Sequence, residues 1–237
     1  MNTIDVSEII SEAWNFTKKH WLKMLLVNIF IAIVNFVISM LFMPSGFWSC
    51  YIEAITTQSA RALAQLQAMA QSMHLYSNYI EYVIISMLEL GVVNAVLLVV
   101  LGKSDTVKLR LGYNISLLNF FNILLGSIIF LIIVSIGTIF CVLPGIYLAC
   151  RLMMYKYIIL NENVNAIDAL QRSWQITEDN GLKIFLLWVL LILINILGLI
   201  LCCVGMFITY IITYFAIAIC YKKLTEQDQV ATTIIND

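Results

Sequence analysis

Three charged side chains inside long apolar stretches are the residues of this sequence best suited to chemistry, namely Glu89, Arg151 and Lys156. A charge within a bilayer is energetically costly, so it usually pairs with another charge or serves a ligand. The planar guanidinium of arginine matches phosphate oxygens, so Arg151 is a candidate donor to a lipid headgroup or another anion. The alternative is a Glu89–Arg151 ion pair that fixes two helices together. Lys156 is expected to extend towards the inner face of the membrane.

Motifs of the common catalytic classes are missing from the sequence. It has neither the phosphate-binding loop of nucleotide-driven pumps nor the Gly-x-Ser-x-Gly motif of serine hydrolases. The six cysteines do not follow a metal-ligand spacing. A net charge of −1 provides no overall basic surface for nucleic acid. We therefore expect a protein that is not an enzyme, binds no nucleic acid and needs no metal or cofactor.

The composition is typical of a protein embedded in a membrane. Hydrophobic residues make up 62% of the 237 residues and charged residues only 11%, and the mean hydropathy is +0.96. About 20 apolar residues in a helix cross a hydrocarbon core. Such runs predict an all-α fold with six transmembrane helices, at residues 21–43, 79–101, 117–143, 145–160, 182–203 and 204–221. Pro144-Gly145 is expected to break the chain between the third and fourth spans.

The basic residues predict how the spans are oriented. With the N-terminus inside, ten lysines and arginines fall in inner segments, whereas the outer segments contain only Arg61. This bias follows the positive-inside rule and places both termini in the cytoplasm. Residues 1–223 then form a single membrane domain. Within it, residues 44–78 form an outer segment with an Ala- and Gln-rich helix, and residues 224–237 follow as a short cytoplasmic tail.

Two segments of the sequence repeat each other at an offset of 160 residues. Residues 11–41 align with residues 171–201 without a gap. Both contain a Trp-x-x-Thr motif, formed by Trp14 and Thr17 and by Trp174 and Thr177. Each motif lies in an amphipathic stretch before an apolar run, which is typical of a helix on the membrane surface with an interfacial tryptophan.

A weaker third copy of the surface helix lies between Lys103 and Ser116. The sequence thus predicts three transmembrane hairpins, each preceded by a cytoplasmic surface helix. These helices are either interfacial anchors or a docking platform for a soluble or membrane protein partner. Because both clear copies begin inside, the repeat is parallel, unlike the inverted repeats of many transporters. Asn35 and Asn195 occupy equivalent positions, so we expect structural hydrogen bonds between helices there.

Three motifs resemble those of the YciC-like family, a largely uncharacterised group of bacterial inner-membrane proteins. They are Met24-Leu-Leu-Val-Asn28 with Phe42-Met-Pro-Ser45, Val142-Leu-Pro-Gly-Ile-Tyr147, and Ala169-Leu-Gln-Arg-Ser-Trp-Gln-Ile-Thr177. The last motif is also similar to the membrane-anchor domains of glycerophosphodiester phosphodiesterases. The resemblance covers residues 1–223. It implies a six-span protein of the bacterial cytoplasmic membrane and work connected with lipids, and it carries over no catalytic residues.

The sequence therefore predicts a multi-pass membrane protein with a scaffold or lipid-handling role, in contact with membrane lipids. The alternative is a transporter or permease component for a small or amphiphilic solute that uses the region of Glu89 and Arg151. A cavity reaching these residues would favour transport, whereas a dry and packed surrounding would favour the scaffold.

Overall fold

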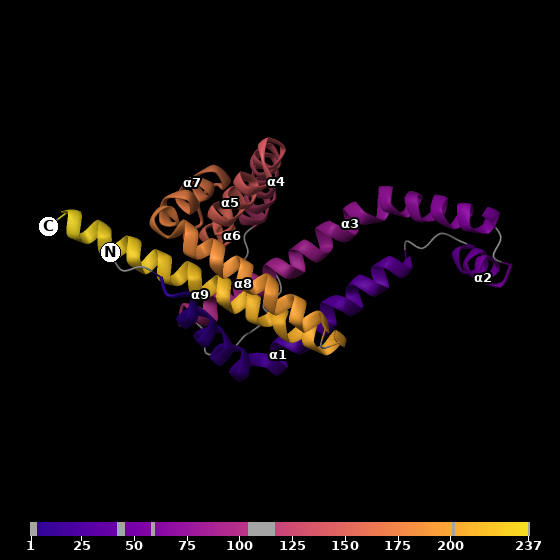
Figure 1. Ribbon diagram of the computed structural model, residues 1–237, viewed down its shortest axis with the longest axis horizontal. Helices are drawn as coiled ribbons and strands as arrows, with labels where there is room; N and C mark the ends of the chain where they lie inside the picture. Colours follow the sequence, from indigo (N-terminus) through magenta and orange to yellow (C-terminus); the bar gives the residue numbers. More distant parts are fainter. Residues whose placement is uncertain (1–3, 42–45, 58–59, 104–116, 201, 237) are drawn as a thin grey trace. The chain divides into compact units, whose positions relative to one another are not determined.

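A computed structural model describes residues 4–41, 46–57, 60–103, 117–200 and 202–236 (Figure 1). Every regular element within these residues is a helix, as predicted. The chain divides into two compact units, which we describe separately: unit 1 contains Met1–Leu25 and Gly91–Asp237, and unit 2 contains Leu26–Leu90. The third surface helix, predicted between Lys103 and Ser116, lies outside the described residues.

The helices of the described residues follow one another along the chain with short connections. They are α1 (Val6–Leu41), α2 (Phe47–Thr57), α3 (Ala60–Val100), α4 (Leu117–Phe140), α5 (Val142–Leu152), α6 (Tyr155–Glu162), α7 (Ala166–Ile176), the 3₁₀ helix η1 (Glu178–Asn180), α8 (Gly181–Ile200) and α9 (Cys202–Asn236). Asp5 caps α1 by accepting hydrogen bonds from the backbone N–H and the hydroxyl of Ser7, at 2.9 and 2.8 Å. These bonds lower the pKa of the Asp5 carboxyl group.

Three helices continue through boundaries that the sequence predicted. α1 joins the first surface helix to the first span, α3 joins the outer segment to the second, and α9 joins the last span to the tail. Residues 6–41 and 60–90 contain neither glycine nor proline. Since nothing local interrupts the backbone hydrogen bonds there, the helix continues.

The second copy of the repeat does break between its surface helix and its span. Here η1 separates α7 from α8. The sequence at the break is Thr177-Glu-Asp-Asn-Gly, whereas the first copy has Thr17-Lys-Lys-His-Trp. Asp, Asn and Gly are weaker helix formers than Lys, so the two copies differ in structure at this point because they differ in helix propensity.

Helices α4 and α5 pack closely against each other in unit 1. α4 ends at Phe140, Cys141 has an extended backbone, and α5 begins at Val142. The turn therefore precedes Pro144-Gly145, where the break was predicted. Pro144 is tolerated in the first turn of α5 because its missing N–H has no helical partner. Gly145 permits the close approach, since a Cβ there would lie 2.8 Å from the Cα and N atoms of Thr138.

Helices α8 and α9 form a second closely packed pair, and they run side by side in Figure 1. Asn195 of α8 donates a hydrogen bond from Nδ2 to Thr213 Oγ1 of α9 at 2.9 Å. This bond confirms the structural role predicted for Asn195. Gly198 lets the helices approach, because a Cβ there would lie 2.4 Å from Thr209 Oγ1.

Five helices of the described residues are long and apolar enough to cross a membrane. They are Val6–Leu41, Leu118–Ile139, Leu143–Glu162, Glu178–Ile200 and Gly205–Val230. At the predicted second span, Ser86–Val100 is a shorter apolar helix. Large apolar side chains point outwards along α4, including Leu118, Phe121, Leu125, Ile128, Ile132, Ile136 and Ile139. Soluble monomers rarely expose so large an apolar surface, so these helices are those of a multi-pass membrane protein.

The close α4–α5 packing leads to a stability prediction. Gly145→Ala should lower the free energy of unfolding by about 1–3 kcal/mol, because its Cβ would overlap the Thr138 backbone. Gly91→Ala is the matched control, since nothing lies within 4 Å of a Cβ at Gly91 and alanine stabilises a helix by about 0.5–1 kcal/mol over glycine. Unfolding in mixed detergent micelles measures both changes, and equal effects of the two substitutions would contradict this packing.

Candidate functional site

The candidate site is centred on Arg151, in the last turn of α5. Its side chain belongs to a helix of the predicted fourth span, yet only 5% of the residue is exposed. Burial removes the guanidinium from water, so its N–H groups need acceptors within the protein. The identity of these acceptors therefore decides what the arginine can do.

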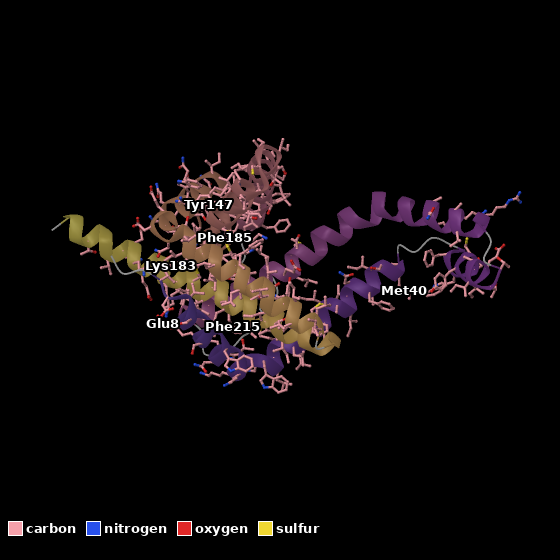
Figure 2. All side chains as sticks on the ribbon, in the orientation of Figure 1. Glu8, Met40, Tyr147, Lys183, Phe185 and Phe215 are labelled. Carbon is pink, nitrogen blue, oxygen red and sulfur yellow. The ribbon has the colours of Figure 1, made fainter. Side chains whose placement is uncertain are left out.

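The Arg151 guanidinium donates three hydrogen bonds to neutral groups of α5, α7 and the residue after α7. Nε donates to Thr177 Oγ1 at 3.2 Å, Nη1 to the Tyr147 hydroxyl at 3.1 Å, and Nη2 to the Trp174 carbonyl at 2.6 Å. The guanidinium carbon Cζ lies 3.8 Å from the centroid of the Trp174 ring, which is a cation–π contact. Tyr147, one turn earlier on α5, is labelled in Figure 2.

The backbone carbonyl of Arg151 is attached to the same helix, α7. It accepts a hydrogen bond from the Ser173 hydroxyl at 2.8 Å. The last carbonyls of a helix have no partner within that helix, so this hydroxyl satisfies one end of α5. Arg151 thus joins α5 to α7 through both its side chain and its backbone.

A backbone carbonyl at the end of α7 compensates the positive charge of Arg151 within unit 1. Among the described residues of this unit, no carboxylate forms an ion pair with Arg151. The Trp174 carbonyl belongs to the last turn of α7, which carries the negative end of the helix dipole. A guanidinium at this position is therefore stabilised without a fixed negative charge. The arrangement can hold α7 in place.

The structure places the predicted site residues in three different surroundings. Trp174 and Thr177 of the second repeat motif contact Arg151 directly. Lys156 lies 5.9 Å from the ring centroid of Tyr155. Glu89 belongs to unit 2 and Arg151 to unit 1. The Glu89–Arg151 ion pair therefore stays a prediction.

Two residues that hold Arg151 were not predicted as site residues, namely Tyr147 and Ser173. The sequence contains a signal for both, because each lies four residues before a partner that was predicted. Tyr147 precedes Arg151 on α5, and Ser173 precedes Thr177 at the end of α7. Residues at this spacing lie on one face of a helix.

The first repeat motif has a similar local structure and a different environment. The Thr17 hydroxyl donates to the Ala13 carbonyl at 2.7 Å, and the Thr177 hydroxyl donates to the equivalent Ser173 carbonyl at 2.7 Å. Both threonines are buried, with exposed fractions of 2% and 0%. The side-chain hydrogen bond of Thr17 stays within α1, whereas Thr177 also holds the buried arginine.

Charged and polar side chains join segments of unit 1 that are far apart in the sequence. Lys223 of α9 forms ion pairs with Glu8 and Glu12 of α1, at 2.8 and 2.9 Å. Asn180 accepts a hydrogen bond from the N–H of Ile4 and donates one to Gln227, and Arg172 of α7 pairs with Asp228 of α9. We call this set the polar platform, formed by Glu8, Glu12, Arg172, Asn180, Lys223, Gln227 and Asp228.

Comparison with known proteins identifies a family for most of the chain. The profile of a family described as a domain of unknown function, DUF7847, matches residues 53–235. This range includes the complete Arg151 site. No curated protein and no solved structure matches the chain.

The two threonines provide a matched pair of substitutions. Thr177→Val should lower the free energy of unfolding by about 1–3 kcal/mol, because it removes an acceptor of the buried Arg151 guanidinium. Thr17→Val should change it by less than about 1 kcal/mol, since that hydroxyl bonds only to its own helix. Unfolding of both variants in detergent micelles tests the difference. If Thr17→Val destabilises the protein as much as Thr177→Val, the assigned role of Thr177 is wrong.

Proposed function

The chain belongs to the DUF7847 family, and we propose that it is a non-enzymatic scaffold of the bacterial cytoplasmic membrane. The spans anchor the protein, and the polar platform with α7 forms its cytoplasmic surface. This surface contacts lipid headgroups or a protein partner. The proposal agrees with what the resemblance to YciC-like proteins implies.

The observation that carries the proposal is the way in which Arg151 is satisfied. An arginine that binds substrate needs donors directed into an accessible cavity. The N–H groups of Arg151 instead donate hydrogen bonds to a tyrosine hydroxyl, a threonine hydroxyl and a backbone carbonyl. The residue is only 5% exposed. A side chain used in this way fixes the position of a helix, which supports a structural role.

The polar platform supports the proposed orientation, with both termini in the cytoplasm. Its members come from the segments before the first span, before the fifth span and after the sixth. All three were predicted to be inner segments, and their mutual contacts support a position on the same side of the membrane. On α7, the exposed Ile167, Asp168, Gln171 and Gln175 are left for contact with headgroups or a partner.

One observation favours the transporter alternative. A guanidinium has five N–H donors, and three hydrogen bonds from Arg151 to protein acceptors are described. An anionic solute would use the remaining donors if the α5–α7 contact opened. The two functions therefore differ in whether water reaches this contact during the working cycle of the protein.

Cysteine accessibility tests the scaffold against the transporter. The six native cysteines are replaced by alanine, and single cysteines are introduced as Ser173→Cys, Ala169→Cys and Gln175→Cys. Ser173 and Ala169 are 0% exposed, whereas Gln175 is exposed. A scaffold predicts that N-ethylmaleimide labels only Gln175→Cys in membrane vesicles.

Labelling in detergent with denaturant is the control that all three thiols can react. Ser173→Cys alters the hydrogen bond to the Arg151 carbonyl and could by itself loosen the site. Ala169→Cys removes no hydrogen bond, so labelling at both positions shows a real opening and not a local effect of the substitution. Labelling of both buried positions at a rate close to that of Gln175→Cys would show that the buried side of α7 opens to water. That result would overturn the scaffold in favour of the transporter.

A further inference from the structure

One face of α1 carries basic and aromatic side chains directly before the apolar part of the helix. Trp14 and Trp21 are 44% and 48% exposed, and Lys18, Lys19 and Lys23 are exposed as well. Trp14, Lys18 and Trp21 lie on the same side of the helix, because they are four and three residues apart. Lys19 and Lys23 are four residues apart on the neighbouring stripe, which also carries Glu8 and Glu12. We call the exposed Trp14, Lys18, Lys19, Trp21 and Lys23 together the basic–aromatic face.

The opposite face of α1 is packed within unit 1. Ile9, Ala13 and Thr17 are buried. Phe16 and His20 stack on Phe215 of α9, with ring centroids 5.7 and 6.2 Å apart; Phe215 is labelled in Figure 2. This packing fixes the rotation of the helix, so Trp14, Lys18 and Trp21 point away from α9.

The three lysines of this face keep their positive charge available. Glu8 and Glu12, acidic residues on the same helix, are both paired with Lys223. Among the described residues, Lys18, Lys19 and Lys23 form no ion pair. Lys18 lies 5.2 Å from the centroid of the Trp14 ring, so tryptophan and ammonium group form one surface.

The second copy of the repeat lacks these features at the equivalent positions. Where the first copy has Lys18, Lys19 and Trp21, the second has Glu178, Asp179 and Gly181. Of the three lysines, only Lys23 has a basic counterpart, Lys183. The ring of Trp174 contacts the buried Arg151 guanidinium, whereas the ring of Trp14 contacts the exposed Lys18. The equivalent positions are therefore mainly basic in the first copy and mainly acidic in the second.

We infer that the basic–aromatic face binds the headgroup phosphates of anionic phospholipids. The inference rests on the proposed location in the membrane. Lysines next to a membrane span are attracted to anionic lipid headgroups, and tryptophan prefers the headgroup layer. At 1.5 Å per residue, the stretch from Trp14 to Lys23 extends over roughly 14 Å, which is longer than the roughly 5–8 Å of one headgroup layer. The polar ends of the lysines can thus meet phosphate groups while the tryptophan rings contact the glycerol and upper acyl region.

Lipid retention tests this assignment. The full-length protein is reconstituted in vesicles of equal phosphatidylglycerol and phosphatidylcholine and extracted, and the lipids that stay bound are identified by native mass spectrometry. The variant Lys18→Gln/Lys19→Gln/Lys23→Gln keeps polar side chains at these positions but removes their charge. The matched control is Lys183→Gln, at the position equivalent to Lys23.

The wild type should retain phosphatidylglycerol in preference to phosphatidylcholine. The triple substitution should reduce this preference at least about fivefold, and Lys183→Gln should leave it unchanged. An unchanged preference in the triple variant would overturn the inference and leave the lysines as determinants of orientation or contacts for an acidic protein.

Extraction of the membrane fraction with alkaline carbonate distinguishes a wrong headgroup site from a wrong proposed function. If wild type and variants stay in the membrane but show no difference in lipid preference, only the headgroup site is wrong. If the wild type is released by carbonate, the membrane scaffold is wrong as well.

Discussion

A guanidinium buried among apolar helices must have its charge and its N–H groups satisfied, and this requirement organises the centre of unit 1. Three hydrogen bonds of Arg151, to the Tyr147 hydroxyl, the Thr177 hydroxyl and the Trp174 carbonyl, and the face of the Trp174 ring serve this requirement. A buried donor without an acceptor would cost several kcal/mol in such surroundings. The end of α7 is therefore held against α5, and the residues that follow α7 begin α8 from a fixed position.

Glycines allow the helices around the Arg151 site to pack closely. Gly137 and Gly145 bring α4 and α5 together, and a Cβ at either position would meet atoms of the other helix at 3.1 Å or less. Gly181, the first residue of α8, lies beside Tyr147, whose hydroxyl would be 3.1 Å from a Cβ at that position. Small residues are common where membrane helices approach closely, because they let backbones and hydrogen-bonding groups come near each other. In this protein, they also leave room for the tyrosine that accepts from Arg151.

The sequence predicted the features that follow from composition and periodicity, and it missed those that depend on packing. The all-helical fold and the apolar helices follow from runs of apolar residues. Arg151 was singled out because it is a charge in such a run, and Trp174 and Thr177 because they repeat Trp14 and Thr17. The sequence did not show that these two observations concern one site, because residues 151 and 174 meet only through the packing of α5 against α7. Helices α1, α3 and α9 extend beyond the predicted spans for a local reason: a change from polar to apolar composition does not end a helix without a breaking residue.

Hydrogen–deuterium exchange of the protein with Arg151→Gln tests the central claim most directly. If Arg151 holds α7 against α5, the substitution should speed amide exchange in α7 by roughly tenfold or more, since it removes charged hydrogen bonds at one end of that helix. Exchange in α4 and in the α8–α9 pair should change little. Unchanged protection of α7, or an equal loss of protection in every helix of unit 1, would contradict the account.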